Sequence, residues 1–129
     1  SPNGENKVLV IDDDADVREL LSRMLKDAGW ISVTARDGKE GLEKVKDTPS
    51  LIVLDLEMPR MDGFEFLDAY MKNYDELNRA PILVYSGKDL SEVQKDILNK
   101  NVAGMVRKDE VSMEELSKIV KNIYQESIS

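Results

Sequence analysis

Short apolar runs alternate with stretches of helical periodicity along this chain, and this alternation constrains the fold more than any other feature. Apolar and β-branched runs that end at turn-forming residues are typical of strands buried on both faces. The predicted strands are residues 7–11, 30–35, 51–54, 82–85 and 102–107. Because a helical pattern follows each strand, we expect a parallel sheet with helices on both faces.

Only a few topologies are compatible with short, right-handed crossover connections. We therefore expect an α/β fold, a doubly wound five-stranded parallel sheet with strand order 2-1-3-4-5. The 129 residues fit one domain, which we place at residues 7–129. Residues 1–6 are interpreted as a linker or remnant outside the fold.

The predicted helices have recognisable ends and apolar faces. Asp14 is expected to cap the first helix and Gly29 to end it. The last helix should begin with a capping box formed by Ser112 and Glu115. The apolar positions expected in the helices at 63–74 and 89–101 are Phe64, Leu67, Met71, Leu90, Val93 and Ile97.

Composition excludes several classes of function. The chain contains no cysteine and no histidine, so neither a disulfide framework, a zinc-thiolate site nor Ser-His-Asp catalysis is available. A net charge of −8 argues against binding to nucleic acid or to an anionic membrane surface. No apolar run approaches the length of a membrane span and no signal peptide is visible, so the expected location is the cytoplasm.

Asp55 directly follows the apolar run at residues 51–54, and Pro59 follows four residues later. A proline cannot continue a central strand, so the chain must already be in a loop at that point. A carboxylate buried without a partner at the end of a strand is costly for stability. Its position therefore indicates chemistry rather than packing.

Other polar residues should gather around Asp55. For the expected topology, ligands bind where the strand order reverses, beyond the carboxyl ends of the first and third strands. The residues placed at this edge are Asp12, Asp13, Asp14, Asp55, Ser86 and Lys108. Clustered carboxylates coexist best around a hard divalent cation, and oxygen ligands suit Mg²⁺, which favours phosphate as a co-ligand.

Three segments resemble the receiver domains of bacterial two-component response regulators. They are Val-Leu-Val-Ile-Asp-Asp-Asp at 8–14, Leu-Asp-Leu-Glu-Met-Pro-Arg-Met-Asp-Gly at 54–63 and Pro-Ile-Leu-Val-Tyr-Ser-Gly at 81–87. The middle segment is highly specific, and Lys108 falls at the family's invariant lysine. The resemblance covers about residues 6–126 and implies a flavodoxin-like receiver fold.

The resemblance implies a role for each matching residue. Asp55 would be the phosphoacceptor, modified by a histidine kinase or a histidine phosphotransfer domain, and the domain itself would not be an enzyme. The implied Mg²⁺ ligands are Asp12, Asp13, Asp55 and the backbone carbonyl of Glu57. Ser86 and Lys108 would bind the phosphoryl group, with Lys108 paired to Asp55 at rest. A downstream effector would then recognise the surface near the fourth helix, fifth strand and fifth helix.

Two positions depart from the family pattern. Met105 stands where the family usually has an aromatic switch residue, and Asp109 stands where a proline in a cis bond usually follows the lysine. Met105 remains a candidate relay, because a flexible thioether can fill a changing gap. The Lys108–Asp109 peptide should be trans. These departures are compatible with a receiver fused to a hybrid sensor kinase.

Simpler interpretations stay open beside this one. The acidic run at 12–14 also suits a helix cap, Ser86-Gly87 an ordinary turn and Lys108 a solvated lysine. A receiver fold used as a non-phosphorylated binding module is one alternative function. A second is a haloacid-dehalogenase-type phosphatase, because Asp12 and Asp14 have its Asp-x-Asp spacing. Asp55→Asn would abolish phosphorylation in a receiver, whereas Asp12→Asn would abolish the covalent step in that phosphatase.

Overall fold

The computed structural model describes residues 6–129, so most of the predicted linker at 1–6 lies outside the described residues. Asn6 is described, and its carbonyl accepts a hydrogen bond from the Ile31 amide. Strands and helices alternate along the chain. They are β1 (Lys7–Ile11), α1 (Ala15–Asp27), β2 (Ile31–Ala35), α2 (Gly38–Lys44), β3 (Leu51–Leu54), α3 (Gly63–Asn73), β4 (Ile82–Ser86), α4 (Glu92–Asn101), β5 (Gly104–Arg107) and α5 (Met113–Ile128).

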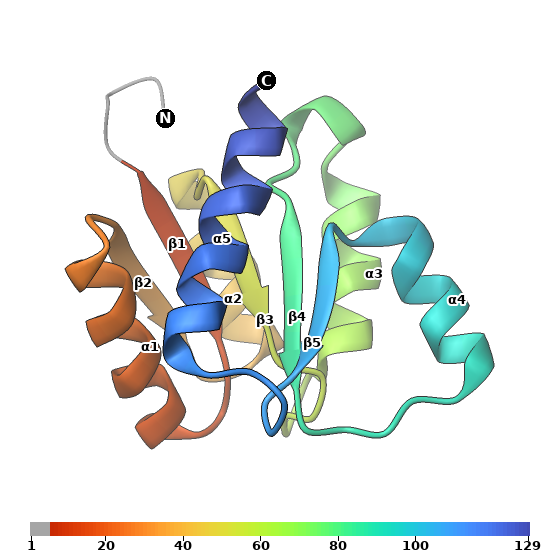
Figure 1. The fold of residues 1–129 in the computed structure, drawn as a ribbon. Coiled ribbons are helices and arrows are strands. Elements are labelled where there is room, and N and C mark those ends of the chain that lie inside the picture. The colour runs from red at the N-terminus through yellow and green to blue at the C-terminus, as the bar shows by residue number, and fades with distance from the viewer. Residues whose placement is uncertain (1–5) are drawn as a thin grey trace.

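The five strands form one parallel sheet in the order β2-β1-β3-β4-β5, which confirms the predicted fold class. All strands point the same way, so their carboxyl ends meet at the lower edge of the sheet in Figure 1. Ile11 of β1 is in register with Leu54 of β3. The residues that follow these two strands therefore leave the sheet side by side.

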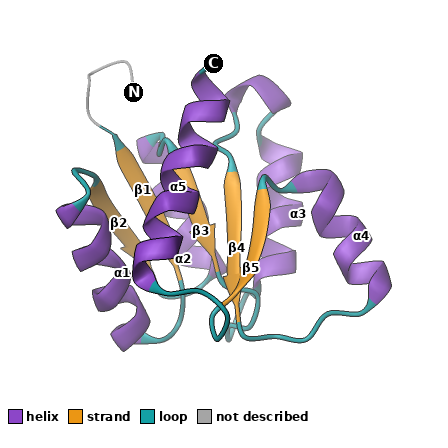
Figure 2. Cartoon of the chain, viewed as in Figure 1, coloured by secondary structure: helices purple, strands orange, loops and turns teal. Residues whose placement is uncertain are grey.

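Helices cover both faces of the sheet (Figures 1 and 2). α1 and α5 pack on one face, where Leu21, Leu25, Leu116 and Val120 join a buried cluster with the strands. α2, α3 and α4 pack against the other face, and Phe66 and Leu98 lie in that second cluster. β1, β3 and β4 are the strands whose apolar residues are most completely buried, as expected for central strands with helices on both sides.

The apolar face of α4 differs from the prediction, and that of α3 is wider than predicted. In α3 the predicted Leu67 is buried and the predicted Phe64 and Met71 pack partly buried against the same cluster, which Phe66 and Tyr70 also join. In α4 the buried residue is Leu98, whereas the predicted Val93 and Ile97 are 69% and 46% exposed. In a helix as short and weakly amphipathic as α4, several stripes match the helical period about equally well, so the sequence does not decide which one faces the sheet.

Side chains cap the helix N-termini as the sequence indicates. Asp14 accepts hydrogen bonds from the amides of Asp16 and Val17. Ser112 and Glu115 form the predicted capping box of α5. Within residues 6–129, none of the helices combines the length and the apolar character needed to cross a bilayer.

Candidate functional site

Asp12 and Asp55 leave adjacent strands at the carboxyl edge of the sheet. The amide of Asp55 donates to the carbonyl of Ile11, and the amide of Asp12 donates to the carbonyl of Ala35. These bonds extend the strand pairing by one residue on each side of β1. The local backbone therefore fixes the two carboxylates at the point where the strand order reverses.

Asp12, Asp13 and Asp55 form a cluster of carboxylates. Each offers an oxygen atom within 4.8 Å of those of the other two, among the residues that the structure describes. Asp12 and Asp55 are only 2% and 4% exposed, whereas Asp13 is exposed to solvent. Three carboxylates with one side open to water match the donor set that Mg²⁺ prefers. Glu57, the fourth predicted ligand, lies in the loop two residues after Asp55.

Lys108 reaches this cluster from the end of β5. Its Nζ lies 2.7 Å from Oδ2 of Asp12 and 3.6 Å from Oδ1 of Asp55. Burial alone lowers the pKa of the Lys108 ammonium, but the hydrogen bond and charge of Asp12, together with Asp55, outweigh burial and hold that pKa above its ordinary value. Lys108 is therefore a cation shared by both buried carboxylates.

The Asp55 carboxyl has a strongly altered acidity. Burial, followed by the negative charge of Asp12, raises the pKa of Asp55 from 3.8 to about 6. The charge of Lys108 and the hydroxyl of Ser86 act in the opposite direction and offset part of this rise. A buried carboxylate next to a second carboxylate is poorly stabilised as an anion, so a bound cation relieves it.

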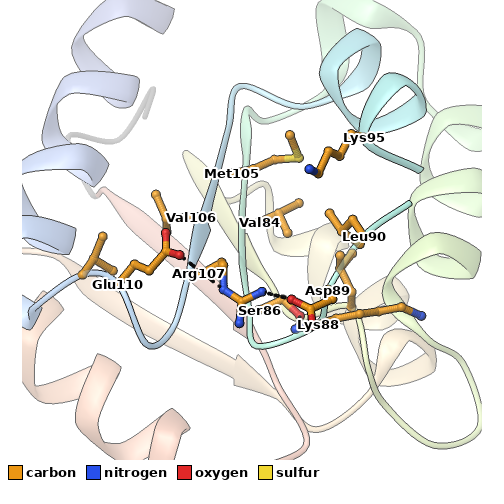
Figure 3. Close-up of a pocket in the computed structure, with 12 residues that line it drawn as sticks. Val84, Ser86, Lys88, Asp89, Leu90, Lys95, Met105, Val106, Arg107 and Glu110 are labelled. Carbon is orange, nitrogen blue, oxygen red and sulfur yellow. Dashed lines mark hydrogen bonds and ion pairs between the residues drawn. The ribbon is translucent and has the colours of Figure 1, made fainter. Parts of the chain in front are cut away.

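Ser86 ends β4 and is 4% exposed, with its hydroxyl next to Asp55. Its Oγ accepts a hydrogen bond from the Lys88 amide at 3.3 Å, and its carbonyl accepts one from the Lys108 amide. Behind Ser86 lies a pocket of about 390 Å³, which Leu56, Val84 and Met105 line (Figure 3). The candidate relay Met105 thus lines the same pocket as the candidate switch hydroxyl and pairs with Val84, two residues before Ser86.

Two further residues contact the site, although the sequence did not assign either of them to it. The Arg18 guanidinium donates to the carbonyl of Asp12 at 2.8 Å, and the Tyr85 ring lies 5.8 Å from Nζ of Lys108. Arg18 lies one turn into α1, so helical periodicity alone could have placed it above the acidic run. The contact of Tyr85 depends on how β4 and β5 pair, which local sequence does not encode.

Arg107 joins the two loops beside the pocket. It forms ion pairs with Asp89 in the loop after β4 and with Glu110 after β5 (Figure 3). A third ion pair joins it to Asp109. Asp109 therefore has a partner of its own at the position where the family usually has proline. The Lys108–Asp109 peptide is trans, as expected.

Comparison with known proteins identifies related sequences and folds. A model of the response regulator receiver domain matches residues 8–121. The chain is 39% identical over 84 residues to Protein PilG of Pseudomonas aeruginosa, across 64% of this chain and 62% of that protein. It is 47% identical over 83 residues to the protein-glutamate methylesterase/protein-glutamine glutaminase 1 of Oleidesulfovibrio alaskensis, across 62% of this chain but only 22% of that protein. The matched region thus spans less than two thirds of either relative's length.

Solved structures agree with the sequence comparison. The chemotaxis protein CheY4 of Vibrio cholerae superposes with a TM-score of 0.79 at 31% identity, covering 93% of this chain and 99% of that one. The CheY-like receiver domain protein of Methanospirillum hungatei reaches a TM-score of 0.84 at 22% identity, covering 95% of this chain and 96% of that one, and this likeness shows the fold alone.

Proposed function

Because the chain belongs to the receiver domain family of two-component response regulators, we propose that it is a phosphorylation-controlled switch with Asp55 as the phosphoacceptor. The observation that carries the proposal is the cluster of Asp12, Asp13 and Asp55 with Lys108 between the two buried members. A carboxylate held beside a cation site and an ammonium is suited to receive a phosphoryl group.

The proposed metal is Mg²⁺, held by the carboxylates of Asp12, Asp13 and Asp55 and by the Glu57 carbonyl. The three carboxylates fit it, since they supply hard oxygen donors within 4.8 Å of one another. When bound, Mg²⁺ offsets the negative charge of the carboxylates and of the phosphoryl oxygens. The protein's contribution is to hold these oxygens together before the phosphodonor arrives.

In the proposed reaction, an Oδ atom of Asp55 attacks the phosphorus of a phosphohistidine on a histidine kinase or histidine phosphotransfer domain. The P–N bond breaks, and its electron pair remains on the imidazole nitrogen, which takes up a proton from solvent. The Lys108 ammonium and the Ser86 hydroxyl donate hydrogen bonds to the phosphoryl oxygens. Since the chain itself is modified, we propose a switch rather than an enzyme.

Phosphorylation then changes the shape of the domain. In this proposal Ser86 moves toward the phosphoryl group, the loop after β4 follows it, and Met105 fills the space that changes in the adjoining pocket. An effector protein or domain recognises the altered surface around α4, β5 and α5. The proposal places the domain in the cytoplasm, acting alone or within a longer regulator or hybrid sensor kinase.

The test is intact-mass measurement after incubation with a small-molecule phosphodonor, with and without Mg²⁺. We expect one added phosphoryl group on the unaltered protein and on Asp68→Asn, an exposed acid of α3 that serves as the matched control. We expect no adduct on Asp55→Asn or when Mg²⁺ is removed. An adduct that survives Asp55→Asn but not Asp12→Asn would instead favour the phosphatase alternative.

A result with no adduct under any condition would contradict phosphoryl transfer as measured by mass. Beryllofluoride then separates the two remaining explanations, because it mimics a bound phosphoryl group without transfer. Binding of beryllofluoride that requires Asp55 and Mg²⁺ would indicate a short-lived phosphoryl group. Failure to bind it would leave the non-phosphorylated binding module as the better description.

A further inference from the structure

Asp37 is a buried carboxylate outside the acidic cluster. It lies at the start of α2, and only 3% of its surface is exposed. One oxygen accepts the amide hydrogen bond of Glu40 at 2.8 Å. The other accepts a hydrogen bond from Nε of Arg60 at 2.8 Å and lies 2.7 Å from Nη2 of the same guanidinium. This charge-assisted hydrogen bond and ion pair, here called the Arg60–Asp37 fork, join the start of α2 to the loop between β3 and α3.

Arg60 has a backbone conformation that its surroundings must maintain. Its φ of 65° places it in the left-handed region, which residues other than glycine seldom adopt. Such a conformation persists when neighbouring contacts over-determine it. The fork to Asp37 is one such contact, even though 62% of the Arg60 side chain is exposed.

The same loop touches α2 at a second point. The Gly38 amide donates to the carbonyl of Met61 at 3.0 Å. A Cβ atom at Gly38 would lie 2.8 Å from that oxygen and 2.7 Å from Cγ of Met61, so the approach requires glycine. Two neighbouring contacts therefore join the loop to the start of α2. Arg60 is held by Asp37, and Met61 is held by the hydrogen bond from the Gly38 amide.

This loop also carries Glu57, three residues before Arg60 and two after Asp55. At its far end, Gly63 packs on the Asp55 backbone, where an added Cβ would lie 2.5 Å from the Asp55 carbonyl oxygen. Any change in the path of the loop therefore reaches both Glu57 and Asp55. The fork acts on a segment whose two functional residues are both proposed metal ligands.

We infer that the Arg60–Asp37 fork is a positioning device that holds the loop between β3 and α3 in the shape that binds the divalent cation. The inference rests on the proposed function, because it assigns Arg60 and Asp37 a part in the affinity of the proposed Mg²⁺ site. Neither residue is among the proposed metal ligands. They act through the backbone of the loop that presents the ligands.

Charge and positioning predict opposite results for Arg60→Ala. Removing a cation near a metal site strengthens Mg²⁺ binding if only long-range charge matters. Loss of the fork weakens Mg²⁺ binding if the fork positions the loop, and we expect the dissociation constant to rise roughly three- to tenfold. This change is smaller than is typical for residues that hydrogen-bond a metal ligand directly. The measurement is calorimetric titration of the purified chain with MgCl₂.

Arg36→Ala is the matched control. Arg36 directly precedes Asp37 and pairs with Glu40 at 3.4 Å. In the described part of the chain, Arg36 forms no hydrogen bond or ion pair with the loop. Its loss removes the same charge from the same region, and we expect Mg²⁺ affinity to be unchanged or slightly higher. Arg60→Gly gives a second variant that relieves the left-handed strain while still removing the fork. It should fold at least as stably as Arg60→Ala and still bind Mg²⁺ more weakly than the parent.

A double variant tests whether the two residues act as one unit. Asp37→Asn keeps a side chain that caps α2 but removes the charge that holds Arg60. Under the inference, Asp37→Asn with Arg60→Ala binds Mg²⁺ no more weakly than the worse single variant. Equal or tighter binding by Arg60→Ala than by the parent would overturn the inference alone. Absence of Mg²⁺ binding by the parent would overturn the proposed function and this inference with it.

Discussion

The ammonium of Lys108 lies closer to Asp12 than to Asp55, at 2.7 Å against 3.6 Å. The ion pair with Asp55 that the family resemblance implies is present, but it is the longer of the two. Lys108 thus partly neutralises both buried carboxylates of the cluster. An incoming divalent cation must share these carboxylates with the lysine, and this competition can be measured.

Lys108→Met should tighten Mg²⁺ binding. Removing the ammonium leaves Asp12 and Asp55 as poorly compensated anions, so we expect the Mg²⁺ dissociation constant to fall roughly three- to tenfold at low ionic strength. The same substitution at Lys118, an exposed lysine of α5 paired with Glu114, serves as the control and should have little effect. Weaker binding in Lys108→Met would mean that the lysine supports the site geometry rather than competing with the metal.

Mg²⁺ binding should weaken as the pH falls through about 6. In the metal-free protein the pKa of Asp55 is raised to about 6, chiefly by burial and then by the charge of Asp12. Below that pH a proton occupies the carboxylate that the metal needs, so each unit of pH should cost about tenfold in apparent affinity. Calorimetric titrations between pH 5 and 8 would measure this dependence, and a flat profile would contradict the raised pKa.

Asp55→Asn should stabilise the metal-free protein at high pH. The folded state holds the Asp55 proton up to about pH 6, whereas the ordinary value is 3.8. Between these values the folded state binds more protons than the unfolded one, so this group's contribution to stability falls as the pH rises. At pH 8 we expect the free energy of unfolding of Asp55→Asn to exceed that of the parent by about 1–2 kcal/mol. At about pH 3.5 the two free energies of unfolding should be nearly equal.

Denaturant unfolding in the presence of a chelator would measure this difference. Asp68→Asn is the control, because Asp68 is exposed on α3 and pairs with Lys72. It should show neither the stabilisation nor its pH dependence. Added Mg²⁺ should reverse the order, because the parent gains binding energy that Asp55→Asn largely loses.

The sequence predicts the fold and most of the candidate site for a clear physical reason. A parallel sheet with buried central strands requires unbroken apolar runs, and Asp12 and Asp55 interrupt such runs where β1 and β3 end. Once the strand order is assumed, topology alone brings the ends of β1, β3, β4 and β5 together. The meeting of charged side chains that are far apart in sequence, at this edge of the sheet, was therefore predictable from the sequence.

The parts that the sequence does not predict depend on side-chain reach and helix rotation. The Arg60–Asp37 fork joins residues 23 positions apart, and nothing local marks either as a partner of the other. In α4, turning the helix by one residue exchanges Ile97 for Leu98 at the sheet. Both outcomes are settled by packing against other elements, which a periodicity count does not include.

Leu98→Ala should test the observed orientation of α4. Leu98 is fully buried against the sheet, so its truncation should lower the free energy of unfolding by about 2–4 kcal/mol. Ile97→Ala, next to it in sequence but on the exposed side, should cost less than about 1 kcal/mol. Thermal or urea unfolding would distinguish them, and the reverse order would mean that the helix faces the sheet as the sequence pattern predicted.

Arg107→Gln should loosen the loop between β4 and α4. Arg107 bridges Asp89 in that loop to Glu110 in the next (Figure 3), and it also pairs with Asp109, so its charge holds the two loops together beside the pocket that Met105 lines. Because these side chains are solvent-accessible, salt should weaken the same contacts. Amide hydrogen exchange at residues 87–91 should become faster in Arg107→Gln and, to a smaller degree, in the parent at high salt. Lys95→Gln is the control, because it removes a charge from another residue that lines the pocket, and it should leave exchange at residues 87–91 unchanged. If exchange is equal in the parent and in Arg107→Gln, the loop is held without the arginine, by contacts such as the hydrogen bond from the Lys88 amide to the Ser86 hydroxyl.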